Sequence, residues 1–85
     1  MIDAGSTLEN ARIEIAESDS LEVLEEIRLR YIGKKGGMTL ILKSLGDLPP
    51  DQRPVVGQRV NAAKDVIIDL LRERQEYLVK RQIEY

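Results

Sequence analysis

The chain has no cysteine, histidine, phenylalanine or tryptophan, and these absences exclude several classes of protein. Without cysteine there is no disulfide framework and no thiolate zinc site. Without histidine the chain lacks the commonest general base and the commonest metal ligand. No apolar run approaches the ~20 residues of a membrane-spanning helix, and the first residues do not resemble a signal peptide. We therefore expect a soluble, cytoplasmic protein with no membrane contact.

Aliphatic side chains must build the core, because tyrosine is the only aromatic residue type and occurs three times. Leucine, isoleucine and valine together account for 26 of the 85 residues. That share is well above the ~20% of bulky aliphatic residues below which chains tend to be disordered. Eighty-five residues support one small domain, and we treat residues 1–85 as a single unit.

Apolar residues recur at helical spacing along most of the chain. Residues 6–9 fit a capping box at the start of a first helix. Asp19 is the predicted N-cap of a second helix, and Gly33 is predicted to end it with a positive φ. The apolar stretch 38–45 is predicted to be a short helix closed by Gly46, because no second strand exists with which it would pair.

The longest predicted element runs from Pro54 to about Glu84 and would be roughly 45 Å long. Pro54 is tolerated because it falls in the first turn of that helix. A long amphipathic helix needs a partner, so we expect the two N-terminal helices to fold back antiparallel on it. The predicted fold is all-α, an antiparallel helical hairpin or coiled-coil arm with a short helix in the turn region near one end. Its predicted core includes Leu24, Ile27, Tyr31, Val60, Ala63 and Ile67.

Charge is distributed unevenly along the sequence. Residues 1–27 hold eight carboxylates against one arginine, a net charge of −7, whereas residues 28–64 hold eight bases against two acids, a net charge of +6. Two interpretations are open. Acidic and basic helices can lie side by side and solvate the fold, which the acidic isoelectric point of about 5.1 favours. Alternatively, the basic middle segment binds a polyanion such as RNA.

Three polar features of the sequence are candidates for a functional role. Lys34 and Lys35 stand between glycines, and they are either solvated turn residues or two ammonium groups held at a tip for phosphate contact. The pattern is not a Walker loop, because no strand precedes it and no serine or threonine follows Lys35. Asn61 is expected to hydrogen-bond one of the turns. The acidic run from Glu22 to Glu26 is interpreted as a solvated face, and no metal site is expected.

Three segments in one order carry a resemblance to a known family. They are Arg30–Thr39 (RYIGKKGGMT), Leu45–Pro54 (LGDLPPDQRP), and Gly57 followed by Val60–Lys64 (VNAAK). Their order and spacing closely resemble the N-terminal domain of the bacterial phenylalanyl-tRNA synthetase alpha subunit. The similarity covers essentially the whole chain and is best between residues 21 and 70.

The resemblance implies a tRNA-binding helical arm that opens a longer chain. That chain would continue into a class II catalytic domain, which binds ATP, magnesium and phenylalanine and works with a beta subunit in an α2β2 assembly. None of the class II catalytic motifs falls within these 85 residues. The segment is therefore expected to be truncated, to have no catalytic residue and no cofactor of its own, and to contact phenylalanine tRNA. The alternative is a helical protein-interaction or assembly module with no nucleic-acid contact.

The predicted tRNA-binding residues are the bases of the middle segment, which would neutralise phosphates without reading bases. The first choices are Arg28, Arg30, Lys34, Lys35 and Lys43, and the second choices are Arg53, Arg59 and Lys64.

Overall fold

The computed structural model of the chain describes residues 4–83, and all of its regular elements are helices. They are α1 (Ala4–Glu17), α2 (Leu21–Ile32), α3 (Gly37–Lys43), the 3-10 helix η1 (Ser44–Asp47) and α4 (Arg53–Ile83). No strand occurs within the described range. The molecule is a rod of 54 × 18 × 17 Å. The all-α prediction is confirmed, including the helix assigned to the short apolar stretch.

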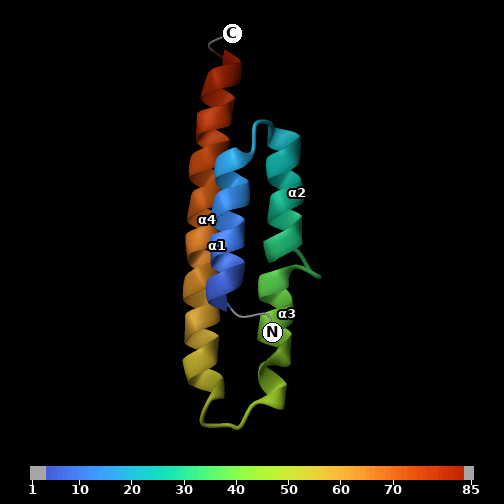
Figure 1. Cartoon of the computed structure of the whole chain (residues 1–85), viewed down its shortest axis with the longest axis vertical. Helices are drawn as coiled ribbons and strands as arrows, with labels where there is room; N and C mark the ends of the chain where they lie inside the picture. The colour runs from blue at the N-terminus through green and yellow to red at the C-terminus, as the bar shows by residue number, and fades with distance from the viewer. Residues whose placement is uncertain (1–3, 84–85) are drawn as a thin grey trace.

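Helix α4 runs along the whole rod, and the other elements lie against it (Figure 1). Helices α2, α3 and η1 run antiparallel to α4, and residues 48–52 form the hairpin turn at one end. Helix α1 makes the most extensive contact with α4 but runs parallel to it. The predicted hairpin is thus confirmed, whereas the expectation that both N-terminal helices run antiparallel to α4 is wrong. The chain reverses direction at residues 18–20, so α1 and α2 are antiparallel to each other (Figure 1).

The N-terminal ends of α1 and α2 differ from the predicted ones. Helix α1 begins at Ala4, so Ser6 lies inside the helix and not at its N-cap. Ser20 caps α2, and its side chain accepts a hydrogen bond from the backbone N–H of Val23 at 3.2 Å. The assignment of that cap to Asp19 is therefore wrong. Serine and aspartate are about equally good N-caps, and the two stand next to each other here.

The glycines predicted to end helices do so differently. Gly33 ends α2 as expected, but with an extended backbone (φ −63°, ψ 174°) and not a positive φ. Gly46 lies inside η1, because the chain tightens into a 3-10 turn directly after α3. Pro54 occupies the first turn of α4, as predicted. Asn61 is exposed and takes part in no side-chain hydrogen bond found among residues 4–83, so its predicted structural role is wrong.

The core is a continuous aliphatic cluster with one tyrosine and one methionine. All six predicted core residues are buried, with Tyr31 the most exposed at 8%. Ile67 is fully buried, as is Met38 of α3. The cluster comprises Ala11, Ile15, Leu24, Ile27, Tyr31, Met38, Val60, Ala63, Ile67, Leu71 and Leu78. The core therefore ties all four α-helices together and fixes the α2–α3 connection against the rod.

Candidate nucleic-acid interface

The eight predicted binding residues do not share one face. They come from α2 (Arg28, Arg30), from the connection after it (Lys34, Lys35), from α3 (Lys43) and from α4 (Arg53, Arg59, Lys64). The connection between α2 and α3 protrudes from the side of the rod, partway along its length (Figure 1). The expectation that its two lysines sit at the tip is therefore wrong, because residues 48–52 form the tip.

Both arginines of α2 are held by carboxylates. Arg28 donates to Glu25 through Nε (2.9 Å) and Nη2 (2.5 Å). This hydrogen bond lowers the pKa of Glu25 and raises that of Arg28. Arg30 donates to Glu14 of α1 and forms the single ion pair found between different helices of the described chain. This ion pair joins α1 to α2, and each of these two helices carries more acidic than basic side chains.

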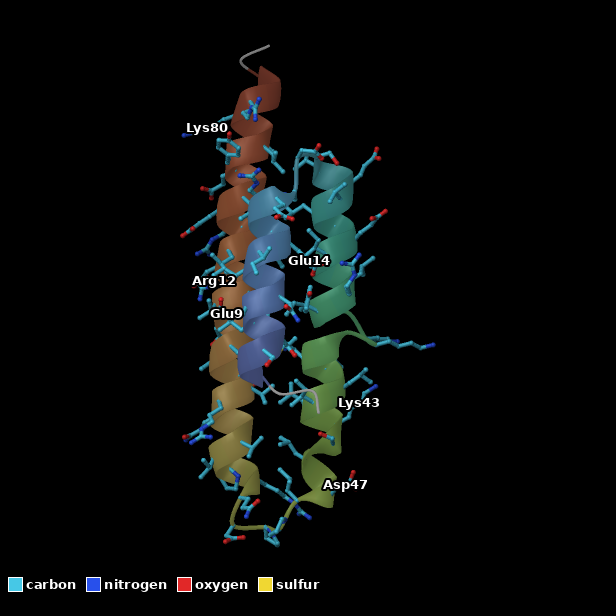
Figure 2. All side chains as sticks on the ribbon, viewed as in Figure 1. Glu9, Arg12, Glu14, Lys43, Asp47 and Lys80 are labelled. Carbon is cyan, nitrogen blue, oxygen red and sulfur yellow. The ribbon has the colours of Figure 1, made fainter. Side chains whose placement is uncertain are left out.

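Glu14 receives a second hydrogen bond, from the hydroxyl of Tyr31. Its side chain lies between α1 and α2 (Figure 2). Burial, followed by the hydrogen bond to Glu14, raises the pKa of Tyr31 to about 12. The carboxylate therefore joins α1 to α2 through two partners, and Arg30 belongs to this junction.

Arg53 is also used internally. Its guanidinium donates to the carbonyl oxygens of Leu48 (2.9 Å) and Gly46 (3.0 Å). These carbonyls belong to the end of η1 and the turn that follows it. Arg53 therefore fastens the hairpin turn to the start of α4.

Residues 33–36, which we call the lysine loop, have a defined backbone path. Gly36 N–H donates to the carbonyl of Gly33 at 2.8 Å, and Leu40 N–H donates to the carbonyl of Gly36 at 2.9 Å. A Cβ at Gly36 would lie 2.6–2.9 Å from backbone atoms of Tyr31 and Ile32. Glycine is needed there because the loop packs directly on the end of α2, not because of an unusual φ.

Three ammonium groups gather around the lysine loop. Lys34 and Lys35 are exposed within it, and Lys43 Nζ donates to the carbonyl of Lys34 at 3.5 Å. Lys43 lies on the flank of α3 that faces away from α4 (Figure 2). No ion pair found among residues 4–83 involves any of the three. Their charge is therefore available to an external anion.

Arg59 and Lys64 lie apart from this group, on α4. They are five residues apart, which on an α-helix is a rotation of about 140°. Arg59 is exposed and Lys64 half-buried, and neither joins an ion pair within the described range. The structure thus brings together three of the eight predicted residues and separates these two.

Sequence reasoning missed a basic residue with a structural task, Arg74. It donates two hydrogen bonds (3.0 and 2.5 Å) to the carbonyl of Ser18 in the α1–α2 turn. Its guanidinium also lies over the ring of Tyr77, 4.6 Å from the ring centroid. No local signal pointed to this contact, because the two residues are 56 positions apart.

Other kinds of site find little support in the described range. No group of three or more potential metal ligands converges within residues 4–83. None of the helices found there is long and apolar enough to cross a membrane. A hollow of about 240 Å³ between α2 and α4 is lined by three leucines, Gln75, Glu25 and Arg28, and the two charged residues pair with each other.

A slender helical hairpin with an exposed basic loop is a helical arm, and similarity to known proteins identifies its family. Residues 19–85 match the family described as the N-terminal domain of class II aminoacyl-tRNA synthetases, and the chain belongs to this family. The resemblance inferred from the sequence is confirmed.

Its relatives include phenylalanine–tRNA ligase alpha subunits from several bacteria. The subunit of Vibrio cholerae is 43% identical over 75 residues, which cover 88% of this chain and 23% of the relative. That of Chromohalobacter salexigens is 44% identical over 68 residues, covering 80% and 20%. That of Moorella thermoacetica is 42% identical over 74 residues, covering 87% and 22%. The chain thus spans about a fifth to a quarter of the relatives' length.

Proposed function

We propose that this chain is the tRNA-binding arm of a cytoplasmic phenylalanine–tRNA ligase and contacts the backbone of phenylalanine tRNA through the lysine loop. The observation that carries the proposal is the group of three ammonium ions, Lys34, Lys35 and Lys43, with no carboxylate partner in the described structure. Membership of the synthetase family supports it, as do relatives named phenylalanine–tRNA ligase alpha subunit.

The chemistry of binding is electrostatic. Lysine ammonium groups neutralise phosphates and release condensed counterions, and such contacts position an RNA without reading its sequence. Arg28, Arg30 and Arg53 are less suited to this task, because each must first give up an internal hydrogen bond. Arg59 and Lys64 remain second choices on a different part of the surface.

The proposal assigns the remaining functions to parts beyond this segment. Phenylalanine activation with ATP and magnesium belongs to the catalytic domain of the longer alpha subunit. The beta subunit completes an α2β2 assembly. These 85 residues contribute binding and orientation of the tRNA and no catalytic group.

Charge reversal in the lysine loop tests the proposal. In the synthetase that carries this domain, Lys34→Glu/Lys35→Glu should raise the KM for phenylalanine tRNA and leave amino-acid activation unchanged. Each lost phosphate contact should lower the slope of log affinity against log salt by about 0.7–0.9. The measurement is aminoacylation against tRNA concentration at three salt concentrations.

Lys80→Glu is the matched control, because Lys80 is exposed on α4 well away from the loop (Figure 2). Lys80→Glu changes the charge in the same direction outside the proposed contact. The slope of its log tRNA affinity against log salt should therefore equal that of the wild type. An unchanged KM and salt slope in the double lysine variant would overturn the proposal.

The alternative is a protein-interaction module, and exposed apolar residues on α4 favour it. Val55 is 51% exposed, Val66 37% and Tyr77 45%. They are spaced 11 residues apart, so they lie along one side of the helix. Apolar contact survives high salt, whereas phosphate contact weakens steeply. The salt titration therefore also separates the two functions.

A further inference from the structure

The hydroxyl of Thr39 bridges the lysine loop to the end of α2. Thr39 Oγ1 donates to the carbonyl of Gly33 at 2.8 Å and lies 3.3 Å from the carbonyl of Ile32. Thr39 belongs to the first turn of α3 and is half-buried. Thr39 carries no charge, and its hydroxyl lies where the lysine loop meets the end of α2.

The hydroxyl supplies a hydrogen-bond donor to both carbonyls. The last carbonyl oxygens of an α-helix find no N–H donor within the helix, and a buried carbonyl left without a donor is costly. A carbonyl oxygen has two lone pairs, and at Gly33 they serve the N–H of Gly36 and the hydroxyl of Thr39. The hydroxyl thus completes the bonding at the point where α2 gives way to the loop.

Besides the backbone hydrogen bonds of the lysine loop, the side-chain hydrogen bonds found there within residues 4–83 come from Thr39 and Lys43. Two of the loop's four residues are glycines, the residue type that loses most conformational freedom on ordering. Lys43 Nζ reaches the Lys34 carbonyl only at 3.5 Å, through a long flexible side chain. A loop ordered before binding avoids paying conformational entropy on association.

We propose that Thr39 is a positioning residue of the tRNA-binding surface: its hydroxyl fixes the lysine loop so that Lys34 and Lys35 are already ordered when they meet phosphate. The residue does not touch the RNA. The inference rests on the proposed function of the loop, and it adds a half-buried hydroxyl to a site otherwise defined by charge.

Thr39→Val removes the hydroxyl and keeps the shape of the side chain. In the synthetase, the KM for phenylalanine tRNA should rise about three- to tenfold, the range expected for one net hydrogen bond. The salt slope should stay unchanged, because both lysines remain and still meet phosphates. Thr39→Ser keeps a hydroxyl and should restore the wild-type KM. A wild-type KM in Thr39→Val, or a Thr39→Ser variant as weak as Thr39→Val, would overturn the proposal.

Amide exchange at Gly36 gives a readout that does not depend on tRNA. In the 85-residue chain alone, Thr39→Val should speed exchange of the Gly36 N–H several-fold while exchange in the middle of α4 stays unchanged. Unaltered exchange at Gly36 would overturn the ordering role of Thr39. If Lys34→Glu/Lys35→Glu leaves the KM unchanged, the proposed function fails instead, and Gly36 exchange still decides whether Thr39 orders the loop.

Discussion

Two neighbouring isoleucines on α4 experience opposite environments, although no residue separates them in the sequence. Ile67 is fully buried in the core, and Ile68 is 40% exposed. Ile67→Ala should lower the free energy of unfolding by about 2–5 kcal/mol, because it removes buried methylene groups and leaves a cavity. Ile68→Ala is the matched control and should change stability by less than about 0.5 kcal/mol. Denaturant unfolding of both variants measures the difference, and equal losses would contradict the assigned faces of α4.

Tyr31 should make stability fall at alkaline pH. Its pKa is about 12 in the folded chain, against an ordinary value of 10. The raised pKa means that its contribution is complete below pH 10 and is lost as the pH rises from 10 through 12. Tyr31→Phe removes this titration, so the difference in unfolding free energy between the two proteins should narrow across that window. Denaturant unfolding from pH 9 to 12 follows it, and a constant difference would contradict the pKa shift.

At this scale the sequence predicted burial better than it predicted hydrogen bonds. Leu24, Ile67 and the other four predicted core residues follow a helical period, which depends only on spacing. All six are buried, as predicted. Ser20 and Asp19 are adjacent and of nearly equal capping strength, so composition alone did not separate them. The predicted hydrogen bond of Asn61 was also wrong. A residue with low helix propensity needs no hydrogen bond to offset that propensity where it is exposed in a long, well-packed helix.

At the scale of the elements, the hairpin turn depends on Arg53, which the sequence analysis had assigned to tRNA binding. Arg53 bridges the carbonyls of Leu48 and Gly46 with two different nitrogens. Arg53→Lys keeps the charge but cannot span both acceptors. We expect it to lower the free energy of unfolding by about 0.5–1.5 kcal/mol and to leave tRNA affinity unchanged.

Arg59→Lys is the control for that substitution, because Arg59 lies on the same helix and is exposed. It should alter stability by less than about 0.5 kcal/mol. Thermal unfolding and a tRNA titration of both variants provide the measurements. A loss of tRNA affinity in Arg53→Lys, with stability intact, would show that Arg53 acts as a phosphate contact.

The order and type of the elements were predictable, but their directions and long-range contacts were not. Pro54 and Gly33 mark helix ends by local chemistry, so the bounds of α4 and α2 came out close to those expected. The direction of α1 relative to α4 depends on how often the chain reverses between them, which the apolar stripe of α4 does not reveal. The contact of Arg74 with Ser18 likewise joins segments that no local pattern relates.

On the scale of the whole molecule, folding converts the charge pattern of the sequence into a charge gradient along the rod. The described acidic residues up to 27 lie on α1, in its connection to α2 and on the first half of α2, beside the part of α4 nearer its C-terminal end (Figure 1). The basic segment 28–64 covers the rest of α2, the lysine loop, α3, the hairpin turn and the start of α4. A polyanion is therefore attracted to one half of the rod and repelled by the other.

Neutralising exposed acids in the repelling half should strengthen tRNA binding without adding a contact. Glu22 and Glu26 are exposed on α2 and belong to no ion pair found in residues 4–83. Glu22→Gln/Glu26→Gln should raise the tRNA affinity of the 85-residue chain about two- to fivefold at low salt, where the Debye length is about 30 Å at 0.01 M. The gain should vanish near 1 M salt, where that length is about 3 Å. A titration with phenylalanine tRNA across this salt range measures it, and a gain that persists at high salt would point to a direct contact at α2 in place of long-range repulsion.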